Sequence, residues 1–152
     1  MANKTLLLEH PIINGNFDII YEHIFDLRKF GEIHPYMKEV TELSKTPTDT
    51  IKYEIKEETY LLGFFKIKPT YEAEVIELEA KKHIRYYSII KKSIMLNINF
   101  FFPENHTSSH FNITERIELR GNPLLIAYFA SILEKAHLQT FENLSKKLKT
   151  SE

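Results

Sequence analysis

Apolar and polar side chains alternate near the start of the chain. Leu6, Leu8, His10 and Ile12 occupy every second position, which is the period of a β-strand with one buried face. The sequence Asn14-Gly15-Asn16 then ends the alternation with residues that favour turns. We therefore predict a first strand that ends before residue 14.

After this turn the apolar residues recur every three or four positions, which predicts a short helix. Asn16 suits its N-cap. The apolar positions are Phe17, Ile20, Tyr21, Ile24 and Phe25. A second helical segment, residues 27–33, contains Gly31 and ends before Pro35, because the residue before a proline avoids the helical conformation. Two short helices are thus expected after the first strand.

Residues 36–119 return to the strand period. The predicted strands are Val40–Leu43, Ile51–Ile55, Phe65–Val75, His83–Ile90, Ser93–Phe102 and Phe111–Leu119. Charged residues occupy the alternate positions of Ile51–Ile55 and Phe65–Val75, so one face of the sheet is predicted to be buried and the other hydrated. With the first strand they predict an antiparallel sheet of about six or seven strands.

The turn between the strands 83–90 and 93–102 leaves two registers open. A two-residue loop, Lys91-Lys92, places Tyr87 and Ile89 beside Leu96, Ile98 and Phe100. A three-residue loop through Ser93 replaces them with Tyr86, Ser88 and Ile90. In both registers the opposite face keeps apolar residues such as Met95 and Phe101, which suggests a monomer or a weak homodimer.

The chain finishes with a long amphipathic helix. Asn122 suits its N-cap and Pro123 its first turn. Its apolar stripe comprises Ile126, Phe129, Leu133, Ala136, Thr140, Phe141, Leu144 and Leu148. Such a helix is expected to pack on the sheet.

Composition narrows the function. The 152 residues suit one domain, and the absence of cysteine excludes disulfides and thiolate metal sites. A net charge of -1 provides no broad positive field, so no nucleic-acid partner is expected. The N-terminus lacks the apolar core of a signal peptide, and the apolar run 124–132 is too short to span a bilayer. We therefore expect a cytoplasmic protein.

Two passages carry a family resemblance. The segment Asn16–Pro35 is similar to the first helix, Asp and short second helix of the START-like superfamily, also called helix-grip or SRPBCC, and Asn122-Pro123-Leu124-Leu125 resembles the start of its last helix. The superfamily includes polyketide cyclases, lipid-transfer domains and plant hormone and allergen proteins. The resemblance implies one START-like domain over residues 1–152, of the α+β class. It also implies a curved sheet around the C-terminal helix and a cavity between them for a hydrophobic or amphipathic molecule.

Several residues are candidates to line that cavity. The aromatic candidates are Tyr53, Tyr71, Phe100, Phe111, Tyr128 and Phe129. Each tyrosine hydroxyl needs a partner when it is buried, which a ligand can supply. The alternative is an ordinary aromatic core. His34, before Pro35, is a candidate for the cavity mouth, with a surface helix-ending histidine as its alternative.

Glu115 is in phase with Phe111, Ile113, Ile117 and Leu119 on an apolar strand face. A buried carboxylate must be paired, hydrogen-bonded or protonated. Glu115 is therefore a candidate ligand anchor or acid–base group. The alternatives are a bulge that turns it outward and a structural partner such as a tyrosine.

Other chemistry finds little support in the sequence. His106 and His110, with Glu104 nearby, have the spacing of two metal ligands on a helix, but they lie in a predicted turn. The four glycines form no nucleotide-binding loop. We therefore expect no metal and no cofactor. His10, His23, His83 and His137 have no partner that the sequence identifies.

The favoured function is binding or transport of a small hydrophobic or amphipathic molecule, such as a lipid, an isoprenoid or a polyketide-like compound. Transient membrane contact would accompany ligand exchange. The first alternative is an enzyme of the cyclase or dehydratase type, with Glu115 and a tyrosine as acid–base groups. The second is a protein-interaction module.

Overall fold

A computed structural model describes residues 1–46, 49–61, 63–104 and 109–150. The strands are β1 (Ala2–Ile12), β2 (Met37–Lys45), β3 (Ile51–Glu57), β4 (Thr59–Leu61), β5 (Phe65–Ile67), β6 (Thr70–Glu79), β7 (His83–Ile90), β8 (Ile94–Phe101) and β9 (Phe111–Gly121). The helices are α1 (Phe17–Phe25), α2 (Leu27–Ile33) and α3 (Pro123–Thr150). This order confirms the predicted α+β class, with two short helices after the first strand and one long C-terminal helix.

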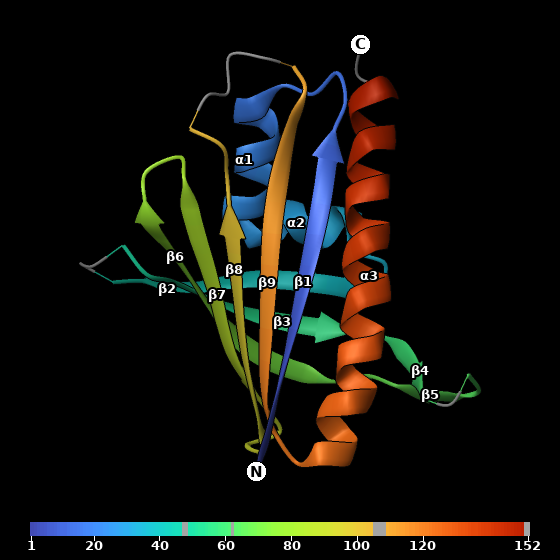
Figure 1. Cartoon of the computed structure of the whole chain (residues 1–152). Coiled ribbons are helices and arrows are strands. Elements are labelled where there is room, and N and C mark those ends of the chain that lie inside the picture. Colours follow the sequence, from blue (N-terminus) through green and yellow to red (C-terminus); the bar gives the residue numbers. More distant parts are fainter. Residues whose placement is uncertain (47–48, 62, 105–108, 151–152) are drawn as a thin grey trace.

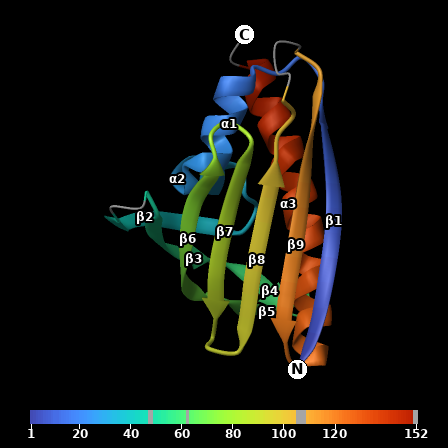
Figure 2. The same ribbon diagram turned by 60° about the vertical axis from the view of Figure 1, so that its left-hand side comes forward.

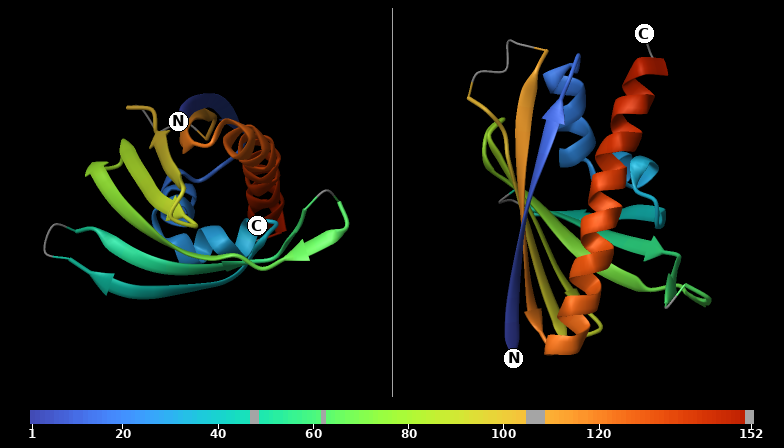
Figure 3. Two further views of the ribbon diagram at one scale, coloured as in Figure 1. Left: turned by 90° about the horizontal axis from the view of Figure 1, so that it is seen from below. Right: turned by 45° about the vertical axis from the view of Figure 1, so that its right-hand side comes forward.

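Seven strands form one antiparallel sheet in the order β1-β9-β8-β7-β6-β3-β2. The strands β6 to β9 run side by side, and β1 lies at the edge next to α3 (Figure 2). Seen from below, the sheet curves around α3 (Figure 3). The strands β2 and β3 cross behind β7, β8 and β9, and the two short helices cover one end of the sheet (Figure 1). The predicted helix-grip architecture is thereby confirmed.

The predicted strand 65–75 is divided in two, which corrects the sequence analysis. Phe65–Ile67 forms β5, which pairs only with β4 in a separate hairpin, and β6 begins at Thr70. Pro69 lies at the break, where it has no N–H to continue a ladder. The alternation keeps the same phase on both sides of Pro69, so it does not reveal the break. As a result Phe65 is exposed rather than buried.

The open register of the β7–β8 hairpin is settled by the pairing of Ile90 with Ile94. The loop therefore has three residues, 91–93. Lys91 and Lys92 both adopt positive φ angles there, 51° and 59°. Tyr86, Ser88 and Ile90 face the interior in consequence. Met95 and Phe101 lie on the outer face, with just over a third of their surface exposed.

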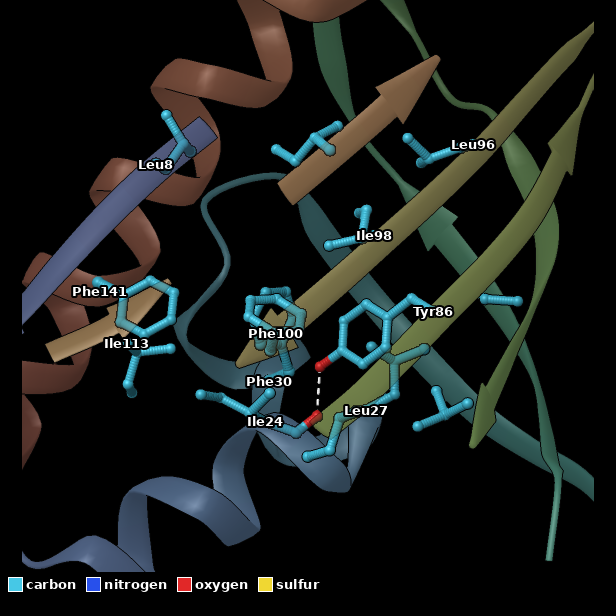
Figure 4. Close-up of a cluster of buried hydrophobic side chains, with 14 of the residues drawn as sticks. Leu8, Ile24, Leu27, Phe30, Tyr86, Leu96, Ile98, Phe100, Ile113 and Phe141 are labelled. Atoms are coloured by element: carbon cyan, nitrogen blue, oxygen red, sulfur yellow. Dashed lines mark hydrogen bonds between the residues drawn. The ribbon is translucent and has the colours of Figure 1, made fainter. Parts of the chain in front are cut away.

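The main core lies between α1, α2, the sheet and the C-terminal half of α3. Phe30, Tyr86, Phe100 and Phe141 form a chain of ring contacts there (Figure 4). The Tyr86 hydroxyl donates a hydrogen bond to the backbone carbonyl of Ile24, so this buried polar atom is satisfied within the core. No described helix is both long enough and apolar enough to cross a membrane.

Candidate functional site

A cavity lies between the N-terminal half of α3 and strands β3, β6, β7 and β8. It has two adjoining parts: one of about 50 Å³ towards α2, here called the inner part, and one of about 60 Å³ towards the β4–β5 hairpin, here called the outer part. The two parts share the wall residues Glu57, Tyr71, Leu96, Ile132 and Leu133. The inner part reaches His34 at the end of α2, and the outer part reaches Thr59 and Ile67 of the β4–β5 hairpin. Most of the wall is apolar, and the polar groups gather at the inner end.

His137 links this inner end to a buried hydrogen-bonded group. Its Nδ1 is bonded to one carboxylate oxygen of Glu115 on β9. The other oxygen of Glu115 lies 2.8 Å from Nε2 of His10 on β1. His10 in turn stacks on Phe141 of α3, with ring centroids 3.7 Å apart. All three polar side chains are buried, so each carboxylate oxygen has an imidazole partner in place of water.

The charge state of Glu115 follows from two opposing effects. Burial by itself raises the pKa of this carboxyl group, because the charged form loses its hydration. The charge of His137, together with the hydrogen bonds from His10 and His137, outweighs burial and lowers the pKa of Glu115 below its ordinary value. Glu115 is therefore an ionised carboxylate that only accepts hydrogen bonds, and both imidazoles donate to it.

His34 lies beside His137, with ring centroids 5.7 Å apart. Its Nδ1 accepts hydrogen bonds from the backbone N–H groups of Tyr36 and Met37, at 3.1 and 3.3 Å. Burial, and then the neighbouring charge of His137, lower the pKa of His34 to about 3. The imidazole is thus neutral at neutral pH. Because Nδ1 accepts, the single ring proton is on Nε2.

Glu57 and Tyr71 complete the polar end. Glu57 is the last residue of β3, and the hydroxyl of Tyr71 on β6 donates a hydrogen bond to its carboxylate. Burial raises the pKa of Glu57, and the hydrogen bond from Tyr71 and the charge of His137 offset this only in part. Glu57 therefore holds a proton more readily than an exposed glutamate does.

This architecture agrees with solved structures of low sequence identity. The Zhui aromatase/cyclase from Streptomyces sp. R1128 superposes with a TM-score of 0.71 at 8% identity, covering 97% of this chain and 94% of its own. A START superfamily protein from Mycobacterium smegmatis gives a TM-score of 0.63 at 9% identity, covering 99% of both chains. The chain has a START-like fold.

A third similar structure is StfQ, a di-domain aromatase/cyclase from the steffimycin biosynthetic pathway. Its TM-score is 0.71 at 14% identity, and the alignment covers 97% of this chain. This chain spans about half of StfQ, 52% of its length. No protein-family model matches the sequence, and no curated protein matches it either. These identities therefore support the START-like fold alone.

Within this START-like fold, some of the predicted site residues line the cavity and others do not. The cavity wall contains His34, Tyr71, Tyr128 and Phe129. Tyr53 and Phe100 belong to the packed core, with 1% and 0% of their surface exposed, and neither lines the cavity. Phe111 lies away from the cavity, beside Phe17 of α1. Glu115 is behind the wall and acts on the cavity through His137.

Sequence reasoning missed His10, Glu57 and His137. The position of each residue in the repeating pattern of apolar residues indicates that it faces the interior. His10 is in phase with the buried positions of β1, and Glu57 continues the inward series of β3. His137 is four residues from both Leu133 and Phe141, which places it on the apolar stripe of α3. Three polar side chains on apolar faces imply mutual partners or a cavity.

The turn that contains His106 lies outside the described residues. Among residues 1–46, 49–61, 63–104 and 109–150, no group of three or more His, Cys, Asp or Glu side chains is arranged to hold a metal ion.

Proposed function

We propose that this protein binds a small hydrophobic molecule with one polar end, and encloses it between α3 and the sheet. The observation that carries the proposal is the polarity of the cavity. Leu96, Ile132 and Leu133 offer an apolar wall. The imidazoles of His34 and His137 line the inner part, and Glu57 lies where the two parts meet. Pockets that orient a ligand combine an apolar wall with a few convergent polar groups.

The ligand classes expected are lipids, isoprenoids and polyketide-like compounds. Two structures with the same fold, Zhui and StfQ, are aromatase/cyclases, which supports the polyketide-like class. The two parts of the cavity are together smaller than the ~150 Å³ that holds one benzene molecule. A larger ligand needs the outer wall to move, and Tyr128 and Phe129 are only half-buried there. Their displacement would enlarge the outer part of the cavity.

Fluorescence of an uncharged probe, N-phenyl-1-naphthylamine, tests binding. Leu133 lines both parts of the cavity, so Leu133→Trp should fill the space and weaken binding at least tenfold, about 1.4 kcal/mol. Leu138→Trp is the matched control, because Leu138 is on the exposed side of the same helix. Equal probe affinity in the two variants, with both folded by circular dichroism, would contradict a ligand site in the cavity.

A second candidate, an enzyme of the cyclase or dehydratase type, is supported by one specific observation. His137 faces the cavity while Glu115 holds its Nδ1, an arrangement that suits a general base. The probe 5-nitrobenzisoxazole reports such a base, because loss of its ring proton breaks the N–O bond and releases a coloured cyanophenolate. Turnover above that of free imidazole, lost in His137→Asn, is expected. Equal rates in the wild type and this variant would count against catalysis.

The expected membrane contact has a candidate surface at the outer part of the cavity. Tyr60, Phe64 and Phe65 of the β4–β5 hairpin are exposed, beside the wall residue Ile67. Exposed apolar rings beside a ligand cavity suit brief insertion into a lipid interface. Flotation with vesicles of phosphatidylcholine and phosphatidylserine should recover the wild type and less of Phe64→Ser. Equal recovery of both would contradict contact through this hairpin.

A further inference from the structure

His34 presents a fixed donor to the inner cavity. Its Nδ1 is occupied by two backbone N–H groups, so its proton must be on Nε2. No residue in the described part of the chain forms a hydrogen bond with this Nε2. His34 is 7% exposed and lines the inner cavity. Because His34 borders the cavity, a ligand atom that accepts a hydrogen bond can pair with this N–H group.

His137 presents the complementary atom. Its Nδ1 donates to the Glu115 carboxylate, so in the neutral imidazole Nε2 carries a lone pair. Within the described residues this Nε2 has no hydrogen-bond partner either. The two rings are nearly perpendicular, at 88°, and both line the inner part of the cavity. With His137 neutral, one donor and one acceptor thus adjoin the same small space; the charged His137 that acts on Glu115 and His34 corresponds to the form that has gained a proton at Nε2.

We propose that His34 and His137 hold one oxygen atom of the ligand between them, and that this oxygen belongs to a weakly acidic hydroxyl group, whose proton passes to His137. The inference rests on the proposed binding function and specifies the polar end of the ligand. A hydroxyl group both donates and accepts, so it is the smallest group that satisfies the two nitrogen atoms together. Phenols and enols have this group in its more acidic form.

The transfer balances without a further reactant. The ligand O–H bond breaks and its electron pair stays on oxygen, while the proton forms a new N–H bond at Nε2 of His137. The resulting imidazolium keeps its Nδ1–H on the Glu115 carboxylate, which compensates the positive charge. The ligand oxyanion accepts the Nε2–H of His34. Such a preorganised donor in a water-poor site is a strong source of anion stabilisation.

Tyr36 also lines the inner part of the cavity, with its ring centroid 5.9 Å from that of His34. The remaining titratable groups around the pair are already engaged. Tyr86 of β7 donates its hydroxyl to the carbonyl of Ile24, and Tyr71 of β6 donates to Glu57 of β3. His10 of β1 is on the far side of Glu115. Burial raises the pKa of Glu57, which lowers the negative charge that an oxyanion meets. None of the engaged groups takes the place of His34 as donor or of His137 as acceptor.

Nitrophenols test the proposal directly, since their ionisation is visible by absorbance. Titration of 4-nitrophenol with excess protein should show the pKa of the bound phenol lowered by at least about one unit, a tenfold change in its ionisation constant. In His137→Asn the side-chain amide still donates to Glu115 but has no atom at Nε2, so the shift should vanish. In His34→Asn the amide oxygen still accepts from the backbone, and the shift should shrink.

His83→Asn is the matched control, because His83 contacts Asn99 outside the cavity and should leave the shift unchanged. Binding of N-phenyl-1-naphthylamine is measured on every variant. Failure of the wild type to bind this probe would overturn the proposed function. Probe binding without a lowered nitrophenol pKa, or with a shift that persists in His137→Asn, would overturn only the assignment of the two histidines.

Discussion

Glu115 on β9 and His137 on α3 share a hydrogen bond in the interior, where neither side chain has more than 3% of its surface exposed. The bond connects the middle of the sheet to the helix that covers it. It also links the stability of the protein to the cavity, because the same His137 side chain lines the cavity wall. Substitutions around this pair therefore allow the two roles to be measured separately.

Loss of the Glu115 side chain should destabilise the protein strongly. Glu115→Ala leaves His10 and His137 without their common partner, and we expect a loss of about 3–5 kcal/mol in the free energy of unfolding. Glu115→Gln keeps the shape and should cost less. Urea unfolding at pH 7 provides the measurement.

The control is Glu118→Gln, which affects a half-exposed ion pair with Arg116 on the same strand. This variant should change the free energy of unfolding by less than about 1 kcal/mol. Similar losses for Glu115→Ala and Glu118→Gln would show that the buried pair is not stabilising.

Acid should destabilise the fold through His34. Its pKa is about 3 in the folded protein against 6.5 in an exposed histidine, so below pH 6.5 the unfolded chain binds a proton that the folded chain does not. Stability should fall by up to about 1.4 kcal/mol per pH unit from pH 6.5 downward. The lowered pKa of Glu115 adds a further loss below its ordinary value of 4.5, whereas the raised pKa of Glu57 acts in the opposite direction.

The variant His34→Asn isolates this contribution, since it keeps the acceptor for the backbone and cannot titrate. Urea unfolding of both proteins at pH 7, 6 and 5 should give a shallower dependence on pH for the variant. Parallel dependences would assign the acid sensitivity to other groups.

Core and cavity residues should respond differently to substitution. Phe100→Leu removes ring contacts with Phe30 and Tyr86 and should cost about 1–3 kcal/mol of stability, with little change in probe affinity. Tyr71→Phe removes the hydrogen bond to Glu57 at the cavity wall and should change the binding of polar-ended ligands more than stability. Titration with a fatty acid and with its methyl ester, alongside urea unfolding, separates the two effects. A binding defect in Phe100→Leu equal to that in Tyr71→Phe would place Phe100 at the ligand.

The start of α3 depends on Asn122. Its side-chain oxygen accepts hydrogen bonds from the backbone N–H groups of Leu124 and Leu125, at 2.9 and 3.3 Å. Asn122→Ala should therefore lower the free energy of unfolding by about 1 kcal/mol, and Asn122→Asp, which keeps the acceptor, should cost little. Thermal unfolding by circular dichroism measures both. A loss of equal size in the two variants would show that the cap does not support the helix.

The order of elements could be predicted because it is a local property of the chain. The strand and helix periods, and the Asn122-Pro123 start of α3, depend on neighbouring residues and appear directly in the sequence. The β4–β5 hairpin was missed because the alternation continues unchanged across Pro69. Only the missing N–H of the proline marked the end of one ladder and the start of another.

The candidate site was less predictable, because it depends on pairing between distant segments. The phase of His10 and Glu115 placed each on a buried face, but their contact requires β1 to lie against β9 in the register that pairs Leu8 with Glu115. The division between cavity and core has the same origin. Tyr71 and Phe100 both point inward from their strands. The position in which α3 packs on the curved sheet determines that Tyr71 lines the cavity and Phe100 is enclosed in the core.

The link between His10 and Glu115 also has a consequence for the time course of folding. The two residues are 105 positions apart, so the chain must close a very long loop before this hydrogen bond forms. Until β1, β9 and α3 have met, water is the better partner for the Glu115 carboxylate. Dehydration of this one charged group is therefore completed only at a late step, when both imidazoles arrive. A partly folded chain can therefore contain most of the sheet and still lack the hydrogen-bonded group of His10, Glu115 and His137 next to the cavity.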